Sequence, residues 1–497
     1  MKRSITTCLI ACGALFFVEF GVELAVPHNS SLSSLFGVMS AQSDDEEKPE
    51  DPRPERKLPT VSQEWYMQVS KVAEAVEEED YEKAKELLAR HVERTRRWNE
   101  RELAIFHERF MQLALTLEDH DLALENAKKI LEYSESITYY LEETALWLIA
   151  RIYGSDQYRD YEKSLEYIQS WLDLKNDWEE GSNNYAFIAS IYTNIEDYYK
   201  VEEWMTRAID KAKEEENKVQ EHWWVQLWQA YVQLSEELED SPKERDSYLQ
   251  KALDLSQFLV YEYIEKKEYW TRLSSVYAKI ESLSETTDEE SRGKWGYTME
   301  GAYHFGLLES ESDLKRVISG IRSKEAHSRA ARVFEEGFNL EIIERNFDNL
   351  NRYGQTLYLT TNMEKAAAAY EEAVSFKDDP TVLHSLASLH QLMDNFDKCI
   401  SFAERALNAT EGELRQPEQV KFLKGVCQFY DDDLDGSEAT MEELREEIGK
   451  DSDNTRLKNL RESAGQYIDL IESERSRIEW KNYVEEQWRL YNESKRS

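Results

Sequence analysis

A pattern of small and apolar residues returns about ten times between residues 62 and 450. Each copy has an aromatic-rich segment, a short polar turn and a second segment with four-residue spacing, as in Ala123/Ala127/Ile130. The first positions of the clearest copies lie 39, 41, 37, 36 and 33 residues apart. Four-residue spacing places side chains on one helical face, and a lone helical hairpin cannot bury that face. The pattern therefore predicts an all-α protein built from stacked hairpins.

A period of this length, helical in both halves, resembles tetratricopeptide repeats (TPRs). We expect a right-handed α-solenoid of about ten TPR-like hairpins, followed by a capping helix and tail over 451–497. The expected divisions are an N-terminal array over 61–280, irregular repeats forming a bend over 281–345, and a C-terminal array over 346–450. The capping helix is predicted by apolar residues at three- and four-residue spacing. They are Leu457, Leu460, Ala464, Tyr467 and Ile471, continued by Trp480, Tyr483, Val484 and Trp488.

The chain is strongly acidic, with 61 Lys and Arg against 101 Asp and Glu and a net charge of −40. Nucleic acid is disfavoured as a partner, because phosphate binding requires clustered basic residues. A solvated acidic exterior is the simpler interpretation, and a site for a basic partner is the alternative.

The N-terminus resembles a secretory signal over 1–40, with Lys2 and Arg3 before an apolar stretch and a small-residue exit near Ala41. Glu19 and Glu23 disfavour a permanent membrane span, since carboxylates are costly within a bilayer. An uncleaved anchor and lipidation at Cys12 are the alternatives. We therefore expect periplasmic export. Residues 41–60, rich in proline and charge, are predicted to form a flexible linker.

Two cysteines, Cys399 and Cys427, remain after the leader and lie 28 residues apart. Each falls on a predicted core position of neighbouring repeats. Buried thiols acting as small hydrophobes are the favoured interpretation. A disulfide is the alternative, which an exported location would permit.

One segment matches the spacing of a calcium-binding loop, D-x-D-x-D-G-x5-E. Its candidate oxygen ligands are Asp431, Asp433, Asp435, Ser437 and Glu442. However, the repeat pattern requires Ser437 on the core face of a helix, so an acidic turn is the favoured interpretation. No other segment has the spacing of a metal, cofactor or catalytic site. We therefore expect a protein without enzymatic activity and without a cofactor.

The aromatic run from Trp223 to Tyr231 is the most unusual apolar segment. Aromatic side chains on adjacent turns cannot all face one neighbouring helix. A thick core helix is the favoured interpretation. The functional alternative is that Trp224, Trp228 and Tyr231 line a groove and anchor a peptide or glycan.

From Lys266 onward the chain also resembles a narrower group of proteins. The similar segments are Lys266-Lys267-Glu268-Tyr269-Trp270, Ala330 to Gly337, and Gln466-Tyr467-Ile468. They resemble the periplasmic TPR proteins encoded beside TonB-type energy-transducing systems of Gram-negative bacteria. The resemblance implies an exported scaffold whose partners are envelope proteins, with TonB-complex components among the candidates. It implies no nucleic acid and no small-molecule substrate. The alternative function is an envelope polysaccharide or outer-membrane assembly factor.

Overall fold

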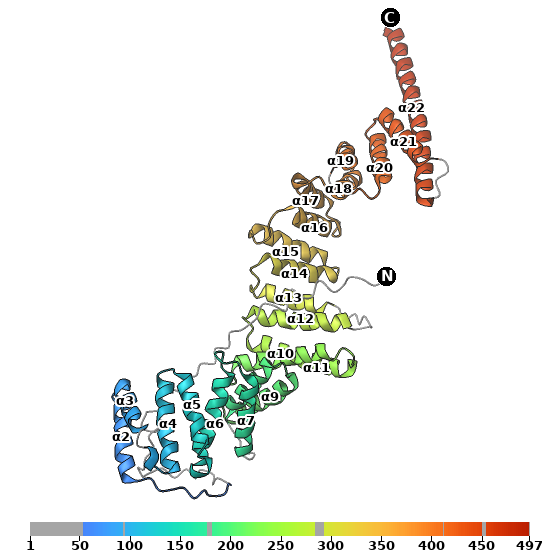
Figure 1. Cartoon of the computed structure of the whole chain (residues 1–497). Coiled ribbons are helices and arrows are strands. Elements are labelled where there is room, and N and C mark those ends of the chain that lie inside the picture. Colours follow the sequence, from blue (N-terminus) through green and yellow to red (C-terminus); the bar gives the residue numbers. More distant parts are fainter. Residues whose placement is uncertain are drawn as a thin grey trace. The chain divides into compact units, whose positions relative to one another are not determined.

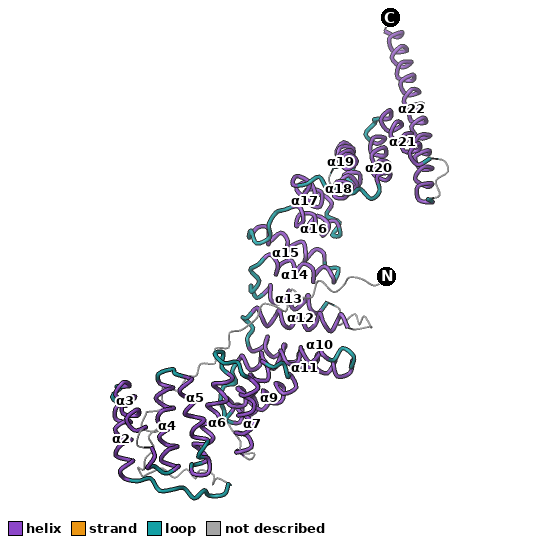
Figure 2. The backbone as a smooth tube through the Cα atoms, viewed as in Figure 1, coloured by secondary structure: helices purple, strands orange, loops and turns teal. Residues whose placement is uncertain are grey.

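The computed structural model describes residues 53–92, 95–175, 181–283, 293–410, 412–449 and 454–496. Within these ranges the chain forms twenty-one α-helices, two short 3-10 helices and no strand (Figure 1, Figure 2). The predicted all-α fold is therefore confirmed. The predicted signal peptide and the first part of the predicted linker lie outside the described residues.

The chain divides into two compact units, and the boundary between them along the sequence falls within α11, between Lys251 and Ala252. The first unit contains α2 Gln63–Glu77, α3 Tyr81–Val92, α4 Glu100–Thr116, α5 His120–Leu131, α6 Tyr139–Gly154, α7 Tyr161–Lys175, α8 Ser182–Asn194, α9 Tyr198–Glu214, α10 Glu221–Glu237 and the start of α11 Pro242–Glu262. The second unit continues from α11 through α12 Lys267–Leu283, α13 Lys294–His304, α14 Glu311–Ser323, α15 His327–Asn339, α16 Phe347–Tyr358, α17 Met363–Phe376, α18 Pro380–Leu392, α19 Phe396–Asn408, α20 Pro417–Tyr430, α21 Leu434–Ile448 and α22 Thr455–Arg496.

Consecutive helices pack as hairpins within each unit. The pairs α4–α5, α6–α7 and α8–α9 do so in the first unit, and α16–α17, α18–α19 and α20–α21 in the second. Each hairpin also packs on the next, for example α5 on α6 and α19 on α20. This arrangement is the one that the repeat pattern predicts, since each hairpin shelters the apolar face of its neighbour.

The hairpin turns share one backbone conformation. A left-handed residue precedes the second helix in most repeats, as at Glu118, Glu196 and Asp394, with φ of 56°, 62° and 57°. An Asp or Asn then caps that helix, and the Oδ1 atoms of Asp119 and Asp197 accept hydrogen bonds from backbone N–H groups three residues later. Such caps satisfy donors that have no partner within the helix. The acidic residues between helices therefore have a structural role.

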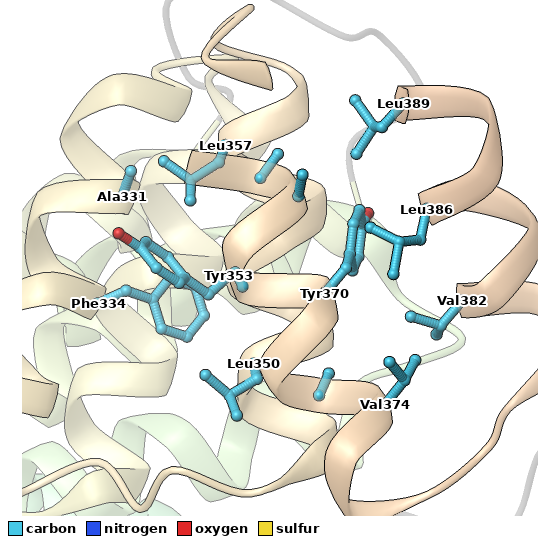
Figure 3. Close-up of a cluster of buried hydrophobic side chains, with 14 of the residues drawn as sticks. Ala331, Phe334, Leu350, Tyr353, Leu357, Tyr370, Val374, Val382, Leu386 and Leu389 are labelled. Carbon is cyan, nitrogen blue, oxygen red and sulfur yellow. The ribbon is translucent and has the colours of Figure 1, made fainter. Parts of the chain in front are cut away.

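Small residues allow the two helices of a hairpin to approach closely. Ser164 and Ser437 begin the core face of α7 and α21, and each is fully buried. Their hydroxyls donate to the carbonyls of Ala150 and Gly425 on the preceding helix, both at 2.8 Å. In Figure 3 Tyr353 lies against Phe334, with ring centroids 5.6 Å apart. Small residues at the contacts and aromatic rings between them together fill the core.

The C-terminal helix α22 has two different parts. Its first part packs on α21 and α20, where Ala464 and Ile471 are fully buried. This confirms the predicted cap over the last hairpin. Beyond Ile471 no described residue of α22 is buried, and Trp480, Tyr483 and Trp488 are exposed. The prediction that these aromatic residues continue the cap is therefore wrong, because the hairpins end before them (Figure 1).

Candidate functional site

The predicted aromatic site lies on α10 in the first unit. Trp223 and Leu227 are buried in the core, whereas Trp224, Trp228 and Tyr231 are each half-buried. The Lys213 Nζ atom of α9 lies 5.3 Å from the centroid of Trp224. The Tyr231 ring lies 6.2 Å from that of Tyr248 at the start of α11. The helix thus supplies one stripe to the core and a second stripe that is partly open to solvent.

Two further tyrosines, which sequence reasoning did not select, extend this stripe. Tyr248 lies 6.2 Å from Tyr199 of α9, and Tyr199 is 52% exposed. We call Tyr199, Trp224, Trp228, Tyr231 and Tyr248 the aromatic surface. The sequence signal for Tyr199 and Tyr248 is weak, because they lie on different helices and only the fold joins them to α10.

A carboxylate and an ammonium group are placed within the aromatic surface. The Tyr248 hydroxyl donates to Glu202 at 3.0 Å, and Lys251 Nζ donates to the other Glu202 oxygen at 2.6 Å. Burial and the nearby Glu202 carboxylate raise the pKa of Tyr231 to about 12, and the same two causes raise that of Tyr248. Both phenols are therefore neutral at physiological pH. The surface presents apolar rings with fixed hydroxyl groups, a composition that is typical of anchor sites for peptides.

A second site is formed by the chain itself. Residues 53–62, which we call the N-terminal arm, contain no helix or strand and pass the N-terminal ends of α4 and α6 (Figure 2). Backbone oxygens of the arm accept hydrogen bonds from folded repeats. Asn99 Nδ2 donates to Thr60 at 2.9 Å, Arg101 to Pro59 at 3.1 Å and Tyr139 to Pro54 at 3.2 Å. These contacts depend on the arm's backbone and not on its sequence.

Two arginines fix the other end of the arm. Arg56 donates to Glu142 Oε2 at 2.6 Å and to the carbonyl of Ser134 at 2.7 Å. Arg53 pairs with Glu143, and both guanidinium groups lie within about 4 Å of the Tyr139 ring centroid, at 4.1 and 3.8 Å. Paired, stacked arginines hold a segment in one place. The described part of the predicted linker is therefore bound to the repeats, which differs from the flexible segment that its composition predicted.

Cys399 and Cys427 form a disulfide that joins α19 to α20, with their Cα atoms 6.3 Å apart. The favoured interpretation of two thiols is therefore wrong, and the alternative holds. The repeat pattern placed both residues on facing core positions, and both are fully buried. Spacing alone could not decide their oxidation state.

The Asp-rich segment near residue 433 has the same structure as the other hairpin turns. Asp432 is left-handed with φ 64°, and Asp433 Oδ1 accepts from the Gly436 N–H at 3.0 Å as the cap of α21. Residues 434–442 are helical, so Asp433, Asp435 and Ser437 point to different sides. Ser437 is buried in its bond to Gly425, while Asp431 and Glu442 are exposed. The described chain thus does not assemble these five residues around one point.

We expect calcium to leave the thermal stability of this protein unchanged. A resident ion would stabilise the folded form in proportion to ligand excess, by about 2.7 kcal/mol at one hundred times Kd. Melting curves at 5 mM calcium and with a chelator should therefore coincide. An upward shift that is abolished by Asp433→Asn and retained in Asp197→Asn, the equivalent cap residue of α9, would contradict the structural role of this turn.

Within the described residues, no group of three or more His, Cys, Asp or Glu side chains is placed to hold a metal ion. In the same part of the chain, every helix is too short or too polar to cross a bilayer.

No protein-family model and no curated protein matches this chain. Among solved structures, it is similar to the TPR2AB domain of yeast Sti1 in complex with pHSP90, at 9% identity over 65% of this chain and 98% of that one, with a TM-score of 0.24. It is also similar to the C-terminal part of a TPR repeat-containing protein from Cytophaga hutchinsonii, at 12% identity over 48% of this chain and 95% of that one, with a TM-score of 0.31. At these values the superpositions are loose, and the repeat architecture rests on the helix pairs described above.

Proposed function

We propose that this protein is an exported helical-repeat scaffold that holds a segment of a protein partner and assists a TonB-dependent outer-membrane uptake system. The observation that carries the scaffold role is the N-terminal arm. The repeats hold this non-helical segment through contacts to its backbone oxygens and through two paired arginines. A fold that binds a segment of its own chain in this way has the means to bind another chain.

The aromatic surface is our candidate for the partner's anchor. Its rings come from three helices, α9, α10 and α11, so that their relative positions are fixed by packing. Tyrosine and tryptophan lose little conformational freedom on binding and contribute a large contact area, which is why they dominate binding energy at interfaces. Glu202 and Lys251 add a polar edge that can orient a bound backbone or side chain.

Export is supported by two independent observations. The sequence begins with a signal-like segment, and the Cys399–Cys427 disulfide is of a kind that persists in oxidising compartments. The link to TonB systems rests on the resemblance of the segments from Lys266 onward. The alternative, an envelope polysaccharide or outer-membrane assembly factor, is favoured by the same half-open tryptophans, since aromatic faces also bind sugars.

We expect Trp224→Ala to weaken partner binding by about thirtyfold, as truncation of an anchor costs about 2 kcal/mol. The helicity of the variant should match that of the wild type. Tyr140→Ala is the matched control, because Tyr140 is an exposed aromatic residue on α6 of the same unit and lies outside the aromatic surface. Affinities are measured with the partner that the crosslinking experiment below identifies.

Photo-crosslinking in intact cells separates the alternatives. A benzoylphenylalanine side chain at position 224 should capture a component of a TonB uptake system, in the osmotic-shock or envelope fraction, whereas one at position 140 should not. Capture of glycan would support the alternative function. Capture of cytoplasmic proteins alone would contradict export, and identical capture at both positions would contradict the aromatic surface.

A further inference from the structure

The end of α22 carries an exposed aromatic stripe that the repeats leave uncovered. We call residues 472–496 the tail helix. Trp480 is 66% exposed, Tyr483 53%, Trp488 60% and Tyr491 51%. Their ring contacts are with each other along the same helix, Trp480 with Tyr483 and Trp488 with Tyr491. A helix without packing is only marginally stable in water. A surface that packed against this stripe would therefore stabilise the tail helix.

The stripe has a palindromic spacing. The residues Trp480, Tyr483, Val484, Gln487, Trp488 and Tyr491 are separated by 3, 1, 3, 1 and 3 positions. Read from either end, the order is aromatic, aromatic, Val or Gln, so the same pattern appears in both directions. On a helix these positions form one continuous face.

We propose that the tail helix pairs antiparallel with the tail helix of a second copy of this chain. A two-fold interface requires a surface that is complementary to itself. An antiparallel pair centred between Glu485 and Glu486 places Trp480 opposite Tyr491, Tyr483 opposite Trp488 and Val484 opposite Gln487. Every ring then meets an aromatic ring of the partner copy, and each of these pairs occurs twice.

The exposed area is sufficient for such a pair. Four rings of about 150–250 Å² each, half to two-thirds exposed, with Val484 and Leu490 supply roughly 600 Å² on each copy. The total of roughly 1,200 Å² lies at the lower limit for specific interfaces. We therefore expect a dimer that forms at micromolar concentrations.

Charge also favours a second copy at this position. The tail helix contains six acidic and six basic residues and is neutral, although the whole chain has a net charge of −40. Elsewhere two copies repel each other. In the antiparallel pair, the last buried residue of each copy, Ile471, lies about 22 Å from the centre at 1.5 Å per residue. The two folded bodies are thus separated by several Debye lengths of about 8 Å.

Sedimentation equilibrium of the full chain tests the proposal. The 58.6 kDa chain should sediment as a dimer at 50 μM. Trp480→Ser with Trp488→Ser should weaken dimerisation at least a hundredfold, whereas Asn482→Ser with Arg489→Ser, on the opposite face, should not. Trp, Asn and Ser have similar helix propensities and Arg has a higher one, so the control loses at least as much propensity, and a selective loss in the tryptophan variant cannot come from that cause.

Disulfide trapping tests the direction of pairing, in a Cys8→Ser, Cys12→Ser background. A mixture of Trp480→Cys and Tyr491→Cys chains should yield the mixed dimer, because equal positions lie about 16 Å apart along an antiparallel pair, whereas a parallel pair would yield same-position dimers. A monomer at 50 μM, a dimer that survives loss of both tryptophans, or same-position dimers would overturn the proposal. So would a monomer that binds phosphatidylethanolamine–phosphatidylglycerol vesicles only when both tryptophans are present, which would assign the stripe to a membrane surface.

Discussion

Gly296→Ala is expected to destabilise the second unit by about 3 kcal/mol, the upper part of the range for overpacked cores. A Cβ atom at position 296 would lie 2.6 Å from the Gly320 Cα and 2.8 Å from its carbonyl carbon. These are backbone atoms of α14, so no side chain can rotate away and α13 and α14 must separate. For a unit of about 250 residues, a loss of 3 kcal/mol lowers Tm by about 6–12 °C.

Gly465→Ala on α22 is the matched control. There the nearest atoms to a new Cβ belong to the Arg445 side chain, at 3.6 Å, which is an ordinary contact. Removing a helical glycine should therefore raise stability by about 0.4–1 kcal/mol. Circular dichroism melts give the sign of each change, and hydrogen exchange should show the loss concentrated in α12–α15. If Gly296→Ala melts like the wild type, the close approach of α13 and α14 is wrong.

The helical hairpins could be predicted from the sequence because their cause is local. Four-residue spacing of small and apolar residues determines a helical face, and the regular period determines which faces meet. The pattern Ala123/Ala127/Ile130, for example, lies on α5, and all three side chains are fully buried. Pro242, Pro380 and Pro417 each begin a helix, where the missing N–H group costs nothing.

The full extent of the two candidate sites could not be predicted, because it depends on contacts between segments that are far apart in the sequence. The N-terminal arm has the composition of a disordered segment, yet Arg56 finds Glu142 and the Ser134 carbonyl some 80 residues away. Tyr199 and Tyr248 join the aromatic surface only because α9 and the start of α11 pack beside α10. The acidic residues between helices could be recognised in the sequence. Their role as helix caps could not, because it depends on the left-handed residue that precedes each of them.

The predicted cap shows how one spacing rule can describe two surfaces. Apolar residues continue at the same spacing from Leu457 to Trp488, but the last hairpin is covered once Ile471 is buried. Spacing identifies a helical face and does not say what covers it. The palindromic spacing around Glu485 and Glu486 is the further observation on which the proposed self-pairing rests.

Loss of the Cys399–Cys427 disulfide is expected to lower the free energy of unfolding by about 3–4 kcal/mol. The bond closes a loop between residues 28 positions apart, and in the chain-entropy treatment this much freedom is removed from the unfolded state. Both cysteines are fully buried between α19 and α20, so Cys399→Ala with Cys427→Ala replaces them by a small apolar residue that fits the same positions. Hydrogen exchange should rise mainly in α18–α21, since repeats contact only their neighbours.

Reduced wild-type protein is the control for lost packing, because it keeps both sulfur atoms and lacks only the bond. If the reduced wild-type protein has the same Tm as the double alanine variant, the bond itself provides the stability. If the oxidised wild-type protein also has that Tm, the disulfide adds no stability. Alkylation in denaturant of protein from the osmotic-shock fraction adds a direct measurement: both sulfur atoms should resist modification until reductant is added. Free thiols in that fraction would mean that Cys399 and Cys427 are two buried, unbonded cysteines. One of the two observations that support export would then be lost.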